Sequence, residues 1–371
     1  MSDGRNATLW QRISEGRQLD ELWSQFTADA RASYGFYGKD VDWDEINKLP
    51  RWRRPFHIAK EIFWAMLMKL TPARRVLLIV ALALLLLSGF QLQYGKSFSM
   101  QVKFDAVAAL IFLLLLSLEL ADKVTMKRDL EIAREIQTWL VPSDPPNVAA
   151  ATVAFATRPQ NSVAGDYYDA FYPTAAQEAA GKLSLVIADV AGKSVPAALL
   201  MATFQASLHT IAGEGVALDA LVPRLNRYAC AHSLQGLRFT TAVLAEYDTA
   251  SRTVNYVNAG HNAPVVRRKN GGIQRLESGG LPLGIHSQAA FQSARIELFP
   301  GDALVLFTDG VVEAFNESGQ EFGDARWVEA VRNLPDGNAQ QSLQFLMRRV
   351  DEFVGATRQF DDITCLVLRC A

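Results

Sequence analysis

The sequence is poor in the side chains that bind zinc or form disulfides. It has 371 residues but only three cysteines, Cys230, Cys365 and Cys370, and five histidines. The cysteines show no C-x-x-C or Cys/His spacing, so neither a zinc site nor a disulfide framework is expected. Reduced thiols in the cytoplasm fit this pattern best.

The chain also lacks an excess of either charge and an apolar N-terminus. Lys and Arg number 37 against 39 Asp and Glu, and the basic residues form no long run outside the N-terminal third. We therefore expect no nucleic-acid partner. The first ten residues, MSDGRNATLW, contain no hydrophobic run, so no cleavable signal peptide is expected.

Hydrophobic residues, in contrast, make up half of the chain, which indicates a membrane segment. Residues 76–95 contain no charged side chain and are long enough to cross a bilayer. A second run, 106–118, continues to Ala121 and would extend about 24 Å as a helix, against a bilayer core of about 30 Å. The short connector predicts a transmembrane helical hairpin over residues 73–122.

The basic residues around this hairpin predict its orientation. They gather before the first run, at Arg74 and Arg75, and after the second, within 123–128, whereas the connector has only Lys96 and Lys103. By the positive-inside rule both termini are cytoplasmic. This predicts a multi-pass protein of the cell inner membrane.

Two further helical segments flank the hairpin. Residues 1–72 form a cytoplasmic region whose basic, aromatic segment 51–75 is either an interfacial helix or an ordinary soluble one. Residues 123–144 predict a linker helix with an apolar stripe from Met126 to Leu140. This helix is either a passive spacer or a coiled-coil arm that forms a homodimer.

Residues 145–371 alternate short β-type runs with helical segments. Strands outnumber helices and are mostly joined as hairpins, which favours an α+β fold over a doubly wound parallel sheet. The expected strands are 152–157, 183–187, 241–246, 253–257, 264–267, 290–298, 303–307 and 363–368. The expected helices are 196–213, 218–233, 325–333 and 339–354.

Acidic residues recur at the ends of these strands. Asp166, Asp189, Asp309 and the pair at 361–362 each adjoin an apolar run. Any one of them alone is common turn chemistry. Several converging carboxylates repel unless cations lie between them, and oxygen ligands without His or Cys select Mg²⁺ or Mn²⁺. Two such ions would generate a hydroxide and hold a phosphoryl group for in-line attack.

An ordered set of motifs covers roughly residues 125–371. They are LEIAREIQTWLVPSDPP, NSVAGDYYD, LVIADVAGKSVPAALLMA, VNAGHNAPVV, LPLGI, VLFTDGVVEAFN and DDIT. As a set they resemble the SpoIIE/RsbU-like branch of the PPM (protein phosphatase 2C-like) serine/threonine phosphatases. The resemblance implies an αββα sandwich with a two-metal site that hydrolyses phosphoserine or phosphothreonine on a protein.

The resemblance also implies roles for individual residues. Asp189 would bridge two Mn²⁺ or Mg²⁺ ions, and the carbonyl of Val190 would bind one of them. Asp166 would serve one metal, and Asp309 and Asp361 the other. Asp362 is the second choice to Asp361, because neighbouring side chains of an extended segment point to opposite sides.

Three nearby residues have two possible roles or depart from the pattern. His261 could donate a proton to the leaving serine oxygen or merely stabilise its turn. Lys193 could meet the substrate phosphate or be solvated, and the surrounding sequence lacks the glycine that a Walker A loop needs. Ser194 replaces the usual second glycine of its turn, at a cost of about 1 kcal/mol if φ is positive there.

The function expected from these features is metal-dependent dephosphorylation of a regulatory protein, for which the family suggests an anti-sigma-factor antagonist. The alternative is a catalytically silent signalling module that binds a partner through the same fold. The intact acidic positions favour the enzyme.

Overall fold

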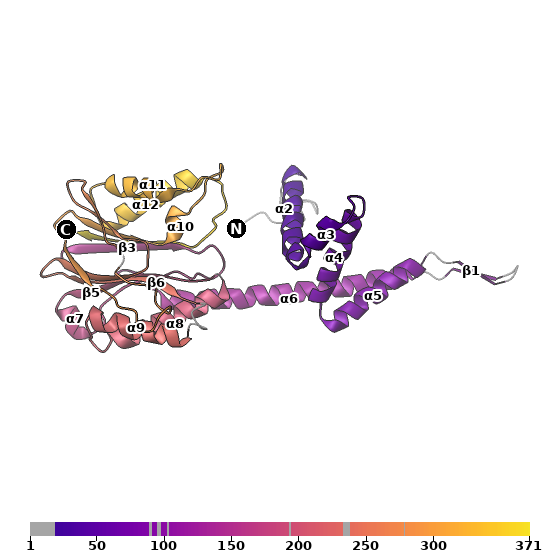
Figure 1. Cartoon of the computed structure of the whole chain (residues 1–371), viewed down its shortest axis with the longest axis horizontal. Coiled ribbons are helices and arrows are strands. Elements are labelled where there is room, and N and C mark those ends of the chain that lie inside the picture. The colour runs from indigo at the N-terminus through magenta and orange to yellow at the C-terminus, as the bar shows by residue number, and fades with distance from the viewer. Residues whose placement is uncertain are drawn as a thin grey trace, which may run out of the picture. The chain divides into compact units, whose positions relative to one another are not determined.

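The computed structural model describes residues 19–88, 91–94, 98–101, 104–192, 194–232, 238–277 and 279–371. The chain divides into two compact units, residues 1–124 and 125–371 (Figure 1). The expectations for residues 1–18 and for Lys193 lie outside the described residues.

The described part of the first unit is mostly helical. Its elements are α2 (Leu19–Tyr37), η1 (Gly38–Asp40), α3 (Trp43–Lys48), α4 (Arg54–Lys69), α5 (Pro72–Leu87), the short strands β1 (Gln91–Tyr94) and β2 (Phe98–Gln101), and the start of α6 (Asp105–Leu140). Helix α4 lies within the segment for which a basic, aromatic helix is predicted. Prolines mark three helix boundaries: Pro55 lies in the first turn of α4, Pro72 begins α5, and Pro142 follows the end of α6.

Helices α5 and α6 form an antiparallel pair with polar contacts at both ends. At one end Arg74 donates to Glu119 at 2.8 Å and to Asp122 at 2.6 Å. At the other, the Ser88 hydroxyl donates to Asp105 at 2.9 Å. Helices α5 and α6 therefore pair over the segment for which a transmembrane hairpin is expected. The predicted second apolar run and linker helix are one continuous element, because no proline or glycine interrupts residues 105–140.

The membrane-crossing property of this hairpin is not confirmed. Among the described residues, one helix is long and apolar enough to span a bilayer by length and composition, and it is α8 (Val195–Ala212). That helix packs on a sheet through Met201, Phe204 and Leu208.

The second unit contains two five-stranded sheets with different strand orders. One has the order β10-β7-β6-β5-β4 and the other β3-β12-β11-β8-β9. The strands are β3 (Ala151–Arg158), β4 (Tyr167–Phe171), β5 (Lys182–Val190), β6 (Thr240–Asp248), β7 (Thr253–Ala259), β8 (Val265–Arg267), β9 (Ile273–Arg275), β10 (Ala294–Glu297), β11 (Ala303–Phe307) and β12 (Ile363–Cys370). All pairings within them are antiparallel.

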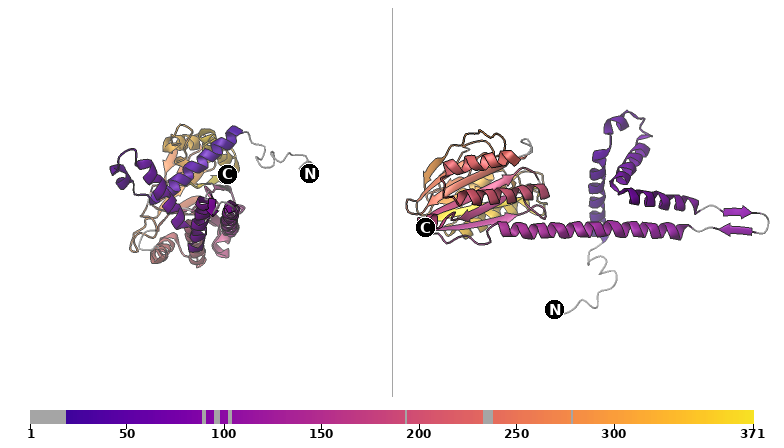
Figure 2. Two further views of the ribbon diagram at one scale, coloured as in Figure 1. Left: turned by 90° about the vertical axis from the view of Figure 1, so that its right-hand side faces the viewer. Right: turned by 90° about the horizontal axis from the view of Figure 1, so that it is seen from below.

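Helices cover the outer faces of the two sheets (Figure 1, Figure 2). Helices α8 and α9 (Leu218–His232) pack on the sheet that contains β5. Helices α11 (Gly323–Arg332) and α12 (Ala339–Val354) pack on the sheet that contains β11. Two single-turn helices, α7 (Ala175–Ala179) and α10 (Asp309–Val312), lie at strand ends. The unit is therefore the predicted αββα sandwich.

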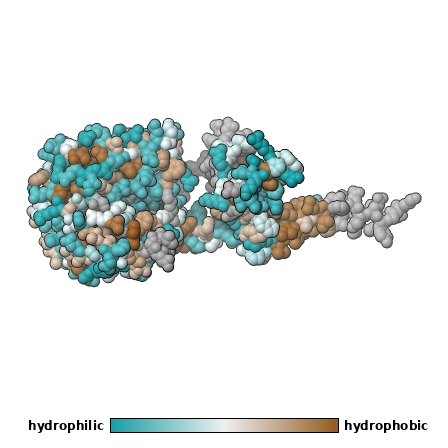
Figure 3. Space-filling model, viewed as in Figure 1, coloured by the Kyte–Doolittle hydropathy of each residue, from teal (hydrophilic) through white to brown (hydrophobic). Residues whose placement is uncertain are grey.

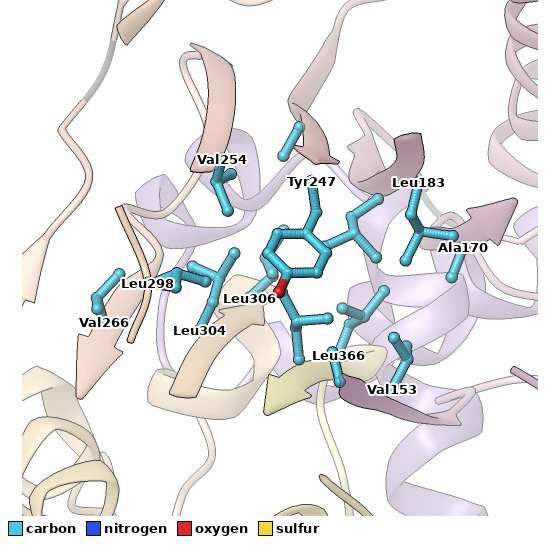
Figure 4. Close-up of a cluster of buried hydrophobic side chains, with 14 of the residues drawn as sticks. Val153, Ala170, Leu183, Tyr247, Val254, Val266, Leu298, Leu304, Leu306 and Leu366 are labelled. Carbon is cyan, nitrogen blue, oxygen red and sulfur yellow. The ribbon is translucent and has the colours of Figure 1, made fainter. Parts of the chain in front are cut away.

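The apolar core between the sheets explains why the strands are hydrophobic on both faces. Leu183, Tyr247 and Val254 from one sheet meet Leu304 and Leu366 from the other (Figure 4). Residues on the opposite faces of these strands pack under the helices. Because both faces are buried, the strands read as nearly continuous apolar runs and leave polar side chains to their ends.

Most predicted strands and helices are present within one or two residues of their expected bounds. Strands β4 and β9 were not predicted, because YYDAF carries a buried aspartate and IQR is too short to show a period. The strand expected over 290–298 is only Ala294–Glu297.

Candidate active site

Asp166 and Asp189 lie side by side at the end of one sheet. Strands β4 and β5 are antiparallel with Tyr167 opposite Ala188, so Asp166 falls opposite Asp189. Gly165 keeps this corner tight: a Cβ placed there would lie 3.2 Å from the carbonyl oxygen of Val190 and 3.7 Å from Oδ1 of Asp189. Three of the predicted metal ligands therefore converge at Gly165.

Asp309 and Asp361 lie at the same end of the opposite sheet. Asp309 is the first residue of α10, directly after β11, and Asp361 shortly precedes β12, the neighbour of β11. The next residue in α10, Gly310, permits the close approach, because its Cβ would lie 2.0 Å from the carbonyl oxygen of Asp362. The TDG and DDIT motifs thus form one corner.

Thr308 and Thr364 connect the two sheets at this end. The Thr308 hydroxyl donates to Oδ2 of Asp166 at 2.8 Å and accepts the backbone N–H of Thr364 at 3.0 Å. The Thr364 side chain also hydrogen bonds with Asp166. Neither threonine was predicted to belong to the site. Thr308 directly precedes Asp309 in TDG, and Thr364 is the last residue of DDIT, three positions after Asp361.

Asp166 is the most strongly perturbed carboxyl of this group. It is 5% exposed, and burial raises its pKa well above the usual range. The charges of Asp189 and Asp362 raise the pKa further, whereas the hydrogen bonds from Thr364 and Thr308 lower it. Three carboxylates from both sheets are therefore close enough to interact electrostatically.

Asp362 anchors the loop that carries Asp166. Its two carboxylate oxygens accept the backbone N–H groups of Gln160 at 2.6 Å and of Gly165 at 2.7 Å. Burial raises the pKa of Asp362, and these hydrogen bonds oppose that effect. Asp361 accepts the backbone N–H of Asp362 at 2.9 Å. Both acids thus lie at the site, and the choice of Asp361 as the ligand stays a prediction.

His261 lies between the two sheets, with both ring nitrogens close to hydrogen-bonding groups. Nδ1 is 2.8 Å from the Thr241 hydroxyl and Nε2 is 3.1 Å from the carbonyl oxygen of Phe307. Since a carbonyl only accepts, Nε2 carries the proton and Nδ1 accepts from Thr241. Burial lowers the pKa of His261 to about 4. These contacts favour the structural role over proton donation.

The turn after Asp189 adopts the strained geometry that its sequence suggests. Ser194 has φ 64° and ψ −147°, a conformation that favours glycine. Nearby, Nη1 of Arg238 donates to the carbonyl oxygen of Ala191 at 3.3 Å. The φ of Ser194 is thus positive, which is the condition under which the serine costs about 1 kcal/mol.

The C-terminal part of α6 contacts the loop that precedes Asp166. The Gln137 side chain donates to the carbonyl of Ala164 at 2.7 Å and accepts its N–H at 3.0 Å. A cavity of about 190 Å³ between α6 and this loop is lined by Arg134, Gln137 and Asp166, among others. The linker helix therefore meets the site directly, a contact that the sequence does not reveal.

The oxygen-rich donor set fits a hard divalent cation. Within the described residues, no group of three or more His, Cys, Asp or Glu side chains is close enough to enclose a metal ion. Mg²⁺ typically takes one or two carboxylates and fills its other positions with water, so a full protein cage is not required. The repulsion among Asp166, Asp189 and Asp362 is what such a cation would offset.

A known family model covers Asp189, Asp309 and Asp361 of this site and begins after Asp166. The family model "Stage II sporulation protein E (SpoIIE)" covers residues 179–371, more than half of the chain. The chain belongs to the SpoIIE family. It carries the serine/threonine phosphatase domain of that family, and the resemblance expected from the sequence motifs is confirmed.

Individual relatives agree with this family. The chain is 26% identical over 280 residues to protein IcfG of Synechocystis, a match that spans 68% of this chain and 43% of IcfG. It is 27% identical over 250 residues to phosphoserine phosphatase RsbU of Bacillus subtilis, spanning 66% of this chain and 70% of RsbU. The chain thus spans less than half the length of one relative and about two thirds of the other.

Solved structures show the same fold. The SiaA-PP2C domain of Pseudomonas aeruginosa has a TM-score of 0.60 at 21% identity and covers 68% of this chain and 99% of that domain. The PP2C phosphatase domain of SpoIIE with a regulatory fragment, from Bacillus subtilis, has a TM-score of 0.51 at 19% identity and covers 59% of this chain and 63% of that one. The second unit therefore has a PP2C-type fold.

Proposed function

We propose that the chain is a Mn²⁺- or Mg²⁺-dependent phosphatase that removes phosphate from serine or threonine of a regulatory protein. The observation that carries this proposal is the convergence of Asp166, Asp189, Asp309 and Asp361 at one end of both sheets in a SpoIIE-family domain. The name of the relative RsbU, phosphoserine phosphatase, supports the reaction class.

In this proposal each acidic residue has a defined place. Asp189 and the Val190 carbonyl would hold cations from one sheet, and Asp309 and Asp361 from the other. Thr308 and Thr364 orient Asp166, and Asp362 holds its loop. When bound, the cations would lower the pKa of water and offset the charge of the phosphate.

Turnover of p-nitrophenyl phosphate by the full-length chain with Mn²⁺ or Mg²⁺ tests this proposal. Asp189→Asn and Asp309→Asn should each leave a folded protein without measurable turnover, since each removes a ligand charge. Asp336→Asn, at a side chain that is 97% exposed outside the site, is the matched control and should keep full activity. Full turnover by Asp189→Asn would reject the metal assignment. An inactive wild-type chain would favour the silent signalling module.

The proposed location is the cell inner membrane, with both termini in the cytoplasm. Apolar side chains are exposed along α5 and the first part of α6, where Figure 3 is brown. They include Val76, Ile79, Leu86, Leu110, Leu113 and Leu116. Burial of this surface in lipid is favourable, and the ion pairs of Arg74 would lie at one membrane surface.

Membrane extraction tests the location. The full-length chain should stay in the membrane pellet at alkaline pH and dissolve only in detergent. Release into the supernatant without detergent would reject the hairpin as a membrane anchor.

We also propose a homodimer through the linker part of α6. Ile132, Ile136 and Trp139 are exposed at i, i+4 and i+7, so they share one face. The neighbouring positions Ala133 and Gln137 are half-buried, and Gln137 contacts the loop before Asp166. Ile132→Glu with Ile136→Glu should reduce the dimer population of the detergent-solubilised chain, as measured by light scattering. A monomeric wild-type chain at all concentrations would reject this part.

A further inference from the structure

A cavity of about 210 Å³ adjoins the candidate metal site on the side of α10 and α12. Two of its lining residues belong to that site: Asp361 itself and Gly310, which follows Asp309. The other walls come from the end of α12 and from the segment that leads into β12. A molecule held in this cavity would therefore lie beside the reacting phosphate.

The lining combines an apolar part with charged and polar residues. Its hydrophobic members are Ala314, Phe315, Val350, Val354, Phe360 and Ile363. The Phe315 and Phe360 rings pack edge to face with centroids 5.6 Å apart, yet Phe360 is 53% exposed. An exposed aromatic ring in a hollow next to a catalytic centre gains free energy when an apolar group covers it.

Two polar groups of the lining also bear on the kind of occupant. Thr357 Oγ1 is buried in the cavity wall and has no hydrogen-bond partner among the residues that the structure describes. A buried hydroxyl without a partner costs free energy that a ligand with a backbone N–H or C=O recovers. Arg158 is paired with Asp351 through Nη2 and Oδ2 at 2.8 Å, so its charge is already offset.

The size of the cavity narrows the class of occupant. Pockets for cofactors and small molecules usually measure about 300–1,000 Å³. A cavity of about 210 Å³ instead suits one amino-acid side chain and a short length of backbone. An extended peptide that places its phosphoserine at the metal site would bring a neighbouring residue to Phe360.

We propose that this cavity binds an apolar side chain close to the phosphorylated residue of the substrate protein, with the Thr357 hydroxyl bonding to the substrate backbone. The inference rests on the proposed phosphatase function and adds the sequence preference of that site. The cavity thereby selects the substrate, while the acidic residues carry the reaction.

Two types of substrate distinguish peptide recognition by the cavity from hydrolysis of the phosphate ester. The full-length chain is assayed with Mn²⁺ on p-nitrophenyl phosphate, which has no peptide, and on phosphoserine peptides with leucine, glycine, aspartate or lysine on either side. The leucine peptides should show kcat/KM about tenfold above the glycine peptides, a ratio typical of one apolar side chain in a pocket. Charged neighbours should not be preferred.

Substitutions in the cavity test whether its residues cause the preference for the leucine peptides. Phe360→Ala should reduce the ratio of kcat/KM for the leucine peptide to that for p-nitrophenyl phosphate about tenfold. Thr357→Val keeps the shape but removes the hydroxyl, so the same ratio should fall while the melting temperature stays the same or rises. Phe299→Ala is the matched control, at a phenylalanine that is 56% exposed outside the cavity, and should leave the ratio unchanged.

Failure of the cavity inference and failure of the phosphatase proposal give different results. Equal kcat/KM for all peptides, or a ratio that neither Phe360→Ala nor Thr357→Val alters, would overturn this inference and leave the phosphatase proposal intact. A preference for a charged neighbour would also overturn it. A wild-type chain that is inactive on both substrate types would remove the phosphatase proposal and this inference with it.

Discussion

The hydroxyl of Thr308 donates a hydrogen bond to Oδ2 of Asp166 at 2.8 Å and so links the two sheets. Thr308 follows β11 in one sheet, and Asp166 precedes β4 in the other. The bond fixes the orientation of a carboxylate that is buried and repelled by its neighbours. The bond therefore sets the position of the Asp166 carboxylate that would bind a cation.

Replacing Thr308 tests this role. Thr308→Val should lower the affinity for Mn²⁺ about 10- to 100-fold, as is typical when the group that orients a metal ligand is lost. Thr308→Ser keeps the hydroxyl and should restore the affinity. Calorimetric titration of the full-length chain with Mn²⁺ measures both. Equal Mn²⁺ affinity in the valine and serine variants would contradict the assignment.

Gln137 connects the linker helix to the loop that precedes Asp166. Its replacement should therefore also alter the metal site. Gln137→Leu leaves the N–H and C=O of Ala164 without their partner and should destabilise the chain by about 1–2 kcal/mol. It should also weaken Mn²⁺ binding, because Ala164 lies two residues before Asp166. Thr138→Val, whose hydroxyl bonds only within α6, is the control. Thermal unfolding with and without Mn²⁺ gives both quantities, and identical curves for the two variants would refute the connection.

His261 should make stability depend on pH. Its pKa is about 4 in the folded chain, against 6.5 for the unfolded one, because burial disfavours the charged ring. As the pH falls below about 6.5, His261 becomes protonated in the unfolded chain but stays neutral in the folded one. The free energy of unfolding therefore falls until about pH 4. The loss is about 3 kcal/mol. The free energy of unfolding of wild type and His261→Gln, measured by urea between pH 7 and 4, should converge by this amount. Parallel pH curves would contradict the buried, neutral state of His261.

Ser194 offers a stabilising substitution. Its φ of 64° and ψ of −147° fit glycine better than any residue with a Cβ. Ser194→Gly should therefore raise the free energy of unfolding by up to about 1 kcal/mol, after the entropy cost of glycine is included. Ser194→Ala retains the Cβ and should give no gain. A melting temperature that responds equally to both substitutions would show that the turn is not strained.

The local chemistry of this chain was readable in its sequence. Apolar runs that end in Asp189 and Asp309 predicted strands with acidic ends, because a strand buried on both faces can carry polar ligands only where it leaves the core. The segments expected to be helical agree with α8, α9, α11 and α12 to within two residues. The serine in place of the usual glycine indicated where the turn would be strained if φ were positive, and φ at Ser194 is positive.

The relations between distant residues depended on the tertiary structure. No spacing indicates that Thr308 meets Asp166, that Gln137 holds Ala164, or that both nitrogens of His261 are occupied. These contacts join segments that are 20 to 142 residues apart, and the packing of two sheets decides them. The pattern of apolar residues in the sequence indicates which face of a strand is buried. Which polar atoms meet at the end of the strand is decided only when the two sheets pack together.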